Sequence, residues 1–148
     1  MKRGLIFAVM SFVLLACNSE QAVQIDDPWV REAPPNARAS GGFMIIKNIS
    51  DQQKILNSAV SSAFEKVEIH QTVAGEGGVM KMVPQPELVI EAKSQVVLKP
   101  GSYHLMLIGA KKPLKAGDEV DLTLKFAKGD EIKLTAPVRK SVGMGHNH

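Results

Sequence analysis

Hydrophobic and polar residues alternate with a period of two along most of the chain after residue 40. Successive side chains of an extended strand point to opposite faces, so this pattern predicts strands with one buried face. Turn residues separate the segments, and no helical period persists over three turns. The predicted strands are 42–48, 55–60, 66–73, 79–83, 87–91, 95–98, 102–108, 119–127 and 131–138. Many short strands joined by regular turns are typical of an antiparallel β-sandwich or barrel, so we expect an all-β fold.

The start of the chain has the features of a secretory signal. Lys2 and Arg3 precede an apolar run over 5–16. This run is too short to cross a bilayer as a helix, which takes about 20 apolar residues. Cys17 follows Leu-Leu-Ala, which resembles the bacterial lipobox, where a cysteine is lipidated and becomes the new N-terminus. The sequence predicts a lipoprotein signal peptide at 1–16; the alternative is an ordinary signal peptide with Cys17 just beyond its cleavage site.

The remaining chain is predicted to be a single domain with short polar ends. Residues 17–26 are interpreted as the lipidated cysteine and a tether, 27–138 as the domain, and 139–148 as a flexible tail that contains His and Met. Three prolines between residues 28 and 35 predict an irregular segment around Trp29. About 130 residues remain after removal of the signal, which is enough for one hydrophobic core.

Charge and cysteine content narrow the chemistry. The full chain has 18 basic and 15 acidic residues, and removal of Lys2 and Arg3 brings the net charge from +3 to +1. This near-neutral balance argues against a nucleic-acid partner. Cys17 is the only cysteine, so the domain has no thiol for a disulfide, a redox pair or a thiolate metal site.

Two His-Met pairs stand out among the remaining polar and sulfur side chains. His104 and Met106 are two residues apart on a predicted strand and therefore share a face, while Leu105 points to the core. His70 and Met82 flank a glycine-rich turn. A hairpin turning about Glu76 places His70 directly opposite Met82, and Thr72 opposite Met80.

These residue types favour Cu(I) over other metals. A thioether is a soft, uncharged ligand that suits Cu(I), whereas zinc prefers Cys, His and carboxylate. A blue-copper electron-transfer centre needs a cysteine thiolate, which the domain lacks. A single Met on a strand usually fills the core, as we expect for Met44, and a single His is usually hydrogen-bonded or solvated. From the residues alone, a metal site and ordinary packing both remain open.

The spacing of these residues resembles the periplasmic copper chaperone family called PCu(A)C. That family's motif is His, ten residues, Met, twenty-one residues, then His-x-Met. Here residues 83–103 supply the twenty-one, while eleven residues separate His70 from Met82. The extra residue leaves Met80 and Met82 as alternative ligands, and Met82 keeps the spacing of twenty-one. Further similarity, over about residues 27–138, includes Trp-Val-Arg at 29–31, Gly-Phe-Met-Ile-Ile-Lys-Asn at 42–48, Val-Met-Lys-Met at 79–82 and Tyr-His-Leu-Met-Leu at 103–107.

This resemblance implies a cupredoxin-like antiparallel β-sandwich with Greek-key connections. It implies an extracytoplasmic carrier, not an enzyme, that binds Cu(I) through His70, Met82, His104 and Met106. The expected location is the periplasm, with a lipid anchor in the membrane. The expected partner is a copper-receiving protein, such as a cytochrome c oxidase subunit or a thiol-bearing assembly factor. The tail residues Met144, His146 and His148 are a candidate second site for Cu(II), with an unstructured end as the alternative.

Two other classes of function remain as alternatives. A non-metal binding module of an envelope lipoprotein would have a buried or scattered set of His and Met residues. An enzyme would need paired carboxylates or a nucleophile, base and orienting acid, and we find no such order near the histidines.

Overall fold

Strand formation follows the alternating pattern closely. The computed structural model describes residues 22–140, which form ten strands and two short 3-10 turns. The strands are β1 (Val23–Arg31), β2 (Ala39–Asn48), β3 (Lys54–Val60), β4 (Phe64–Ala74), β5 (Met80–Gln85), β6 (Leu88–Ile90), β7 (Ser94–Leu98), β8 (Tyr103–Ala110), β9 (Glu119–Phe126) and β10 (Glu131–Arg139). The turns are η1 (Glu76–Gly78) and η2 (Ala127–Gly129). Each of the nine predicted strands is confirmed, and the described residues include no helix that could cross a membrane.

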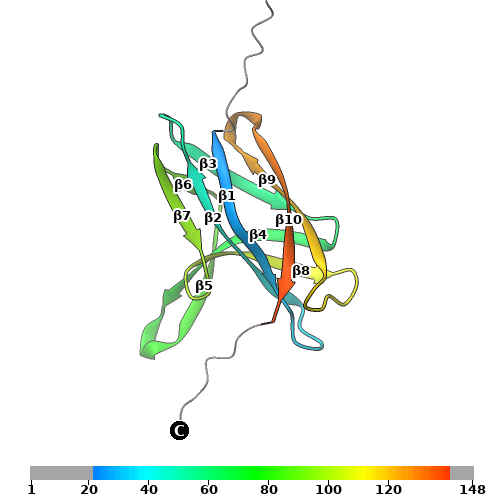
Figure 1. Cartoon of the computed structure of the whole chain (residues 1–148). Helices are drawn as coiled ribbons and strands as arrows, with labels where there is room; N and C mark the ends of the chain where they lie inside the picture. The colour runs from blue at the N-terminus through cyan, green and yellow to red at the C-terminus, as the bar shows by residue number, and fades with distance from the viewer. Residues whose placement is uncertain (1–21, 141–148) are drawn as a thin grey trace, which may run out of the picture.

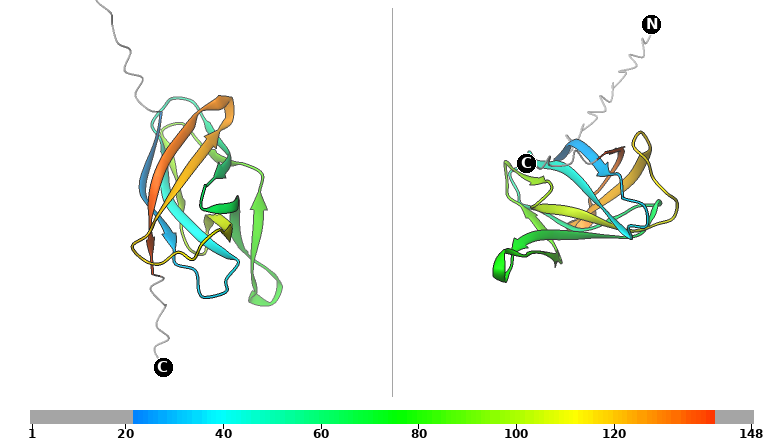
Figure 2. Two further views of the ribbon diagram at one scale, coloured as in Figure 1. Left: turned by 90° about the vertical axis from the view of Figure 1, so that its right-hand side faces the viewer. Right: turned by 90° about the horizontal axis from the view of Figure 1, so that it is seen from below.

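The strands form two packed layers (Figures 1 and 2). The hydrogen-bonded order is β5-β4-β8-β2-β1-β10-β9-β3-β6, and β7 pairs with the second half of β2. The path bends between β1 and β10, so that β10, β9, β3 and β6 cover the layer built by β5, β4, β8, β2 and β1. All pairs are antiparallel except β1 with β10, where Val30 lies beside Val138 in a parallel register.

The inward faces of the two layers make one hydrophobic core. Alternate residues of β8 and β9 are almost fully buried in it, as the period of two requires. Met44 is 2% exposed, which confirms its expected role as a core residue. Other core residues are Val30, Ile46, Leu56, Ile90, Leu105, Leu107, Val120, Leu122 and Leu124.

Strand β1 was not predicted, because the sequence between residues 23 and 31 breaks the alternation. The register of β1 against β2 shifts between Asp26 and Trp29, which marks a β-bulge. Asp27 has a φ of 43° within the bulge, and Pro28 follows it where the ladder is interrupted. A bulge is one of the few places where a strand tolerates proline. The predicted irregular segment is therefore wrong for β1.

The β4–β5 hairpin projects beyond the sandwich at one corner (Figure 1). Its turn centres on Gly77, whose φ of 69° lies in the left-handed region that glycine tolerates. The prediction placed the turn about Glu76, and it is wrong by one residue at the centre and by two in the register.

Candidate metal centre

The outward face of the β4–β8 pair brings the two histidines together. His104 and Met106 point to this face, while Leu105 between them is fully buried in the core, as predicted. In the β4–β8 ladder, His70 lies directly opposite His104, and Glu68 lies opposite Met106. The cross-strand partner of His70 on this side is thus His104. This pairing comes from the sheet topology and was not predicted from the sequence.

Strand β5 pairs with the opposite edge of β4 and carries the two methionines. Met82 lies opposite Thr72, and Pro84 occupies the position opposite His70 that was predicted for Met82. A shift of two residues keeps every side chain on its original face, so Met82 still points to the same side of the sheet as His70. Met80 lies opposite Ala74, one further step toward the hairpin turn.

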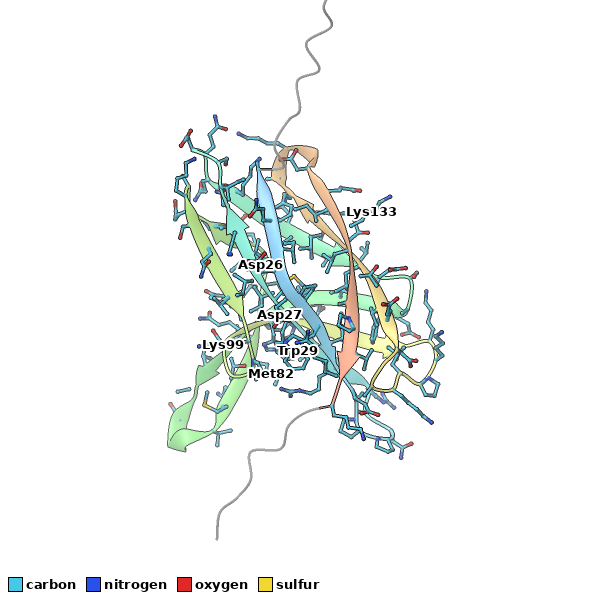
Figure 3. The ribbon with its side chains drawn as sticks, in the orientation of Figure 1. Asp26, Asp27, Trp29, Met82, Lys99 and Lys133 are labelled. Atoms are coloured by element: carbon cyan, nitrogen blue, oxygen red, sulfur yellow. The ribbon has the colours of Figure 1, made fainter. Side chains whose placement is uncertain are left out.

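A cavity of about 470 Å³ opens on this face. Met82, His104 and Met106 all border it, together with Thr72 from β4, whereas Met80 is not among its lining residues. In Figure 3, Met82 lies on the side of the β4–β5 hairpin that faces β1, where Trp29 is labelled. His70 is not among the lining residues either, but its ring centroid lies 5.9 Å from that of His104, which is.

Each histidine has one nitrogen in a hydrogen bond and one nitrogen without a partner. Nδ1 of His104 lies 3.0 Å from the carbonyl oxygen of Ser102, which can only accept, so Nδ1 donates. Nε2 of His70 lies 2.8 Å from Oε2 of Glu68 and donates to that carboxylate. The remaining nitrogens, Nε2 of His104 and Nδ1 of His70, are buried and unpartnered. In neutral imidazoles these two atoms carry free lone pairs, which is the arrangement that metal-binding histidines use.

Glu68 is held as an acceptor by its neighbours. The ammonium of Lys66, and then the hydrogen bond from His70, lower the pKa of the Glu68 carboxyl from its ordinary value. The carboxyl is therefore ionised at neutral pH and accepts from the His70 ring. A carboxylate behind a histidine fixes the ring orientation and the position of its free lone pair.

The aromatic ring of Phe43 forms part of the cavity wall, and sequence analysis did not identify it. The Phe43 ring lies 4.5 Å from the Trp29 ring and 6.4 Å from the His104 ring, between centroids. Gly41 lies opposite Met106 in the β2–β8 ladder. A Cβ on Gly41 would be only 2.5 Å from Cζ of Phe43, so this glycine makes room for the ring. A glycine inside a strand pattern often marks such a close approach, and this was the available signal.

Other predicted sites have no structural description here. The described residues exclude Cys17, Met144, His146 and His148, and also the predicted signal peptide and most of the predicted tail. Among residues 22–140 no group of three or more His, Cys, Asp or Glu side chains is placed to hold a metal ion. A site made of two histidines and two methionines falls outside this criterion, because methionine is not one of the four residue types.

Comparison with known sequences gives a family match over most of the chain and related proteins. A family model described as "Putative lipoprotein LpqE-like" matches residues 23–138. "Putative lipoprotein Lxx21020" of Leifsonia xyli subsp. xyli is 32% identical over 126 residues, which cover 85% of this chain and 75% of that protein. "Uncharacterized protein RP573" of Rickettsia prowazekii is 34% identical over 116 residues, covering 73% of this chain and 61% of that protein.

Comparison with solved structures identifies the fold. The copper-bound PCuAC domain from PmoF2 superposes with a TM-score of 0.69 at 23% identity, over 81% of this chain and 94% of that domain. The solution structure of CuI-DR1885 from Deinococcus radiodurans superposes with a TM-score of 0.64 at 31% identity, over 84% of this chain and 85% of that protein. The cupredoxin-like β-sandwich of the PCuAC type is thereby confirmed.

Proposed function

The chain belongs to the "Putative lipoprotein LpqE-like" family, and on this premise we propose that it is a copper chaperone that binds one Cu(I) ion. The proposed ligands are His70, Met82, His104 and Met106. The observation that carries the proposal is a pair of buried, unpartnered imidazole nitrogens on neighbouring rings, one of which, His104, lines a cavity together with two thioethers. Buried polar atoms without partners are uncommon, and a bound metal ion would satisfy both.

The chemistry of the donors supports copper in its lower oxidation state. Two neutral imidazoles and two thioethers make a soft, uncharged set, which suits Cu(I) and is poor for zinc or for hard cations. The structural neighbours PmoF2 and DR1885 were solved with copper, the latter as Cu(I). The present chain shares their fold, and its proposed donors are suited to Cu(I). The choice of Met82 over Met80 rests on the cavity, which Met82 borders.

The proposed cellular role is transfer outside the cytoplasm. We place the chain in the periplasm, attached to the membrane by lipid on Cys17, with residues 17–26 as tether and 27–138 as the copper-binding domain. Neutral thioethers release Cu(I) without a proton exchange, which suits a carrier and not an enzyme. The recipient that fits this chemistry is a copper-receiving protein such as a cytochrome c oxidase subunit or a thiol-bearing assembly factor.

A Cu(I) titration tests the proposal. The soluble domain, residues 18–148, is titrated under reducing conditions against a chromophoric Cu(I) chelator, and one ion should bind per chain. X-ray absorption should then show a mixed shell of nitrogen and sulfur. The double variant His70→Ala/His104→Ala should lose high-affinity binding. A shell of nitrogen and oxygen without sulfur would contradict the proposed ligand set.

The tail adds a second part to the proposal. We assign His146 and His148, with Met144, to a weaker Cu(II) site, because imidazole nitrogen is a good ligand for Cu(II). This site is independent of the Cu(I) ligands in the sandwich, so removal of the tail separates the two.

A further inference from the structure

Arg31 is a charged residue on the cavity wall that the proposed copper site does not use. It is the last residue of β1, and it borders the same cavity as Met82, His104 and Met106. Its guanidinium lies over the Phe43 ring, with Cζ 5.2 Å from the ring centroid. A guanidinium held over a ring face keeps its N–H groups in its own plane, where they can form hydrogen bonds at its edge.

A second arginine, in a similar position, has the carboxylate partner that Arg31 lacks among the described residues. Arg139 lies beside Arg31 in the parallel β1–β10 pair and also stacks on an aromatic ring, that of Trp29. The difference is that Arg139 has a carboxylate partner, Asp27, at 2.8 Å. Within residues 22–140 Arg31 makes no ion pair, and its Nε is buried with no hydrogen-bond partner. A buried donor of this kind is normally satisfied by some group, and Arg31 is also one of the residues that line the cavity.

We propose that Arg31 binds a carboxylate group in this cavity, next to the copper site. The planar guanidinium matches a carboxylate through two parallel hydrogen bonds. The volume of about 470 Å³ is within the range of small-molecule sites. The walls include Phe43, Pro34 and Pro100, so the favoured ligand has an apolar body attached to its carboxylate.

The carboxylate has two sources with the same chemistry. It belongs either to a small organic acid or to an acidic side chain of a partner protein. Its biological meaning rests on the proposed function, because a carboxylate here lies where copper is received or released. The interaction itself is measurable on the metal-free protein, so failure of copper binding and failure of carboxylate binding are separate results.

The test follows the Arg31 Nε–H signal of the metal-free domain by ¹H–¹⁵N NMR. N-acetylmethionine represents the small acid, and the blocked peptide acetyl-Gly-Glu-Gly-amide represents a partner side chain. At least one of them should shift the Arg31 Nε–H signal and signals around the cavity in a saturable manner, and the stronger ligand identifies the source. N-acetylmethionine amide, which lacks the charge, should not shift these signals.

Matched variants distinguish a site from general charge attraction. Arg31→Gln should weaken binding of the carboxylate about tenfold or more, since a hydrogen bond to a charged group is lost. Arg38→Gln removes an exposed arginine from the loop before β2 and should leave the affinity unchanged. Glu32→Gln removes the only carboxylate among the cavity-lining residues and should strengthen binding.

Two results would overturn the proposal. One is an Arg31 Nε–H signal in the unaltered protein that neither carboxylate shifts, a measurement that needs no variant to fold. The other is an equal loss of affinity in Arg31→Gln and Arg38→Gln. Thermal unfolding of each variant checks that the sandwich is retained.

Discussion

Removal of the Glu68 carboxylate should weaken Cu(I) binding although Glu68 is not a proposed ligand. Oε2 of Glu68 lies 2.8 Å from Nε2 of His70, and this hydrogen bond orients the ring so that Nδ1 is the free nitrogen. Loss of a carboxylate behind a metal-binding histidine typically lowers metal affinity by about 10- to 100-fold. We expect Glu68→Ala to fall in this range, and Glu68→Gln to lose less because its amide oxygen still accepts.

The matched control is Glu87→Ala. Glu87 is an exposed acidic residue between β5 and β6, so this variant makes the same change in net charge away from the site. All variants are compared by competition with a Cu(I) chelator at neutral pH, and folding is checked by circular dichroism. If Glu68→Ala, correctly folded, binds Cu(I) as tightly as Glu87→Ala, the carboxylate does not orient the histidine and the reasoning is refuted.

The pH dependence of this contact follows from the lowered pKa of Glu68. Because Lys66 and His70 favour the ionised carboxyl, its contribution to the folded state is present above the ordinary glutamate pKa. That contribution is lost only as the pH falls through the lower pKa of the folded state. Between pH 5 and pH 8 the carboxylate therefore stays ionised, and any loss of copper in this range has another origin.

Three further predictions concern the ligands, the anchor and the tail. Met82→Leu conserves volume and should weaken Cu(I) binding in the chelator competition more than Met80→Leu; the reverse order would assign Met80 as the ligand. Cys17→Ser should remove the protein from the membrane fraction or block its maturation; unchanged fractionation and unchanged mass of the mature protein would exclude lipidation. Deletion of residues 143–148 should abolish Cu(II) binding while Cu(I) affinity is retained, and Cu(I) affinity should fall gradually with falling pH because protons compete with the metal for imidazole nitrogen. Titration of each copper state between pH 5 and pH 8 tests this, and loss of Cu(I) on truncation would contradict two separate sites.

Most of the strands could be predicted because hydrophobic residues recur at every second position of a strand with one buried face. The strands that lack this signal are the informative cases. In β1 the bulge at Asp27 changes which residues face inward, and Pro28 adds a signal that usually ends a strand. The parallel pairing of β1 with β10 joins residues more than 100 positions apart, and no local pattern encodes such a contact.

The candidate site was predictable in its residue types but not in its pairing. The i, i+2 spacing of His104 and Met106 fixes their shared face, and the structure confirms that geometry. The hairpin register depends on the conformation of the turn, and one residue of uncertainty at Gly77 moved Met82 from His70 to Thr72. The His70–His104 pairing and the Phe43 wall depend on which strands become neighbours, so they need the tertiary structure.

The proposed ligands differ sharply in their access to solvent, and this bears on how copper would leave. His70 and His104 are 6% and 5% exposed, whereas Met82 is 58% exposed on the edge strand β5. An incoming ligand from a partner can therefore approach Met82 but not the imidazoles. Displacement of this thioether would need no proton and would leave the other three proposed ligands in place. The buried histidines, held by Glu68 and Ser102, then keep the vacated site in its binding geometry, so that loading and release would use the same exposed edge.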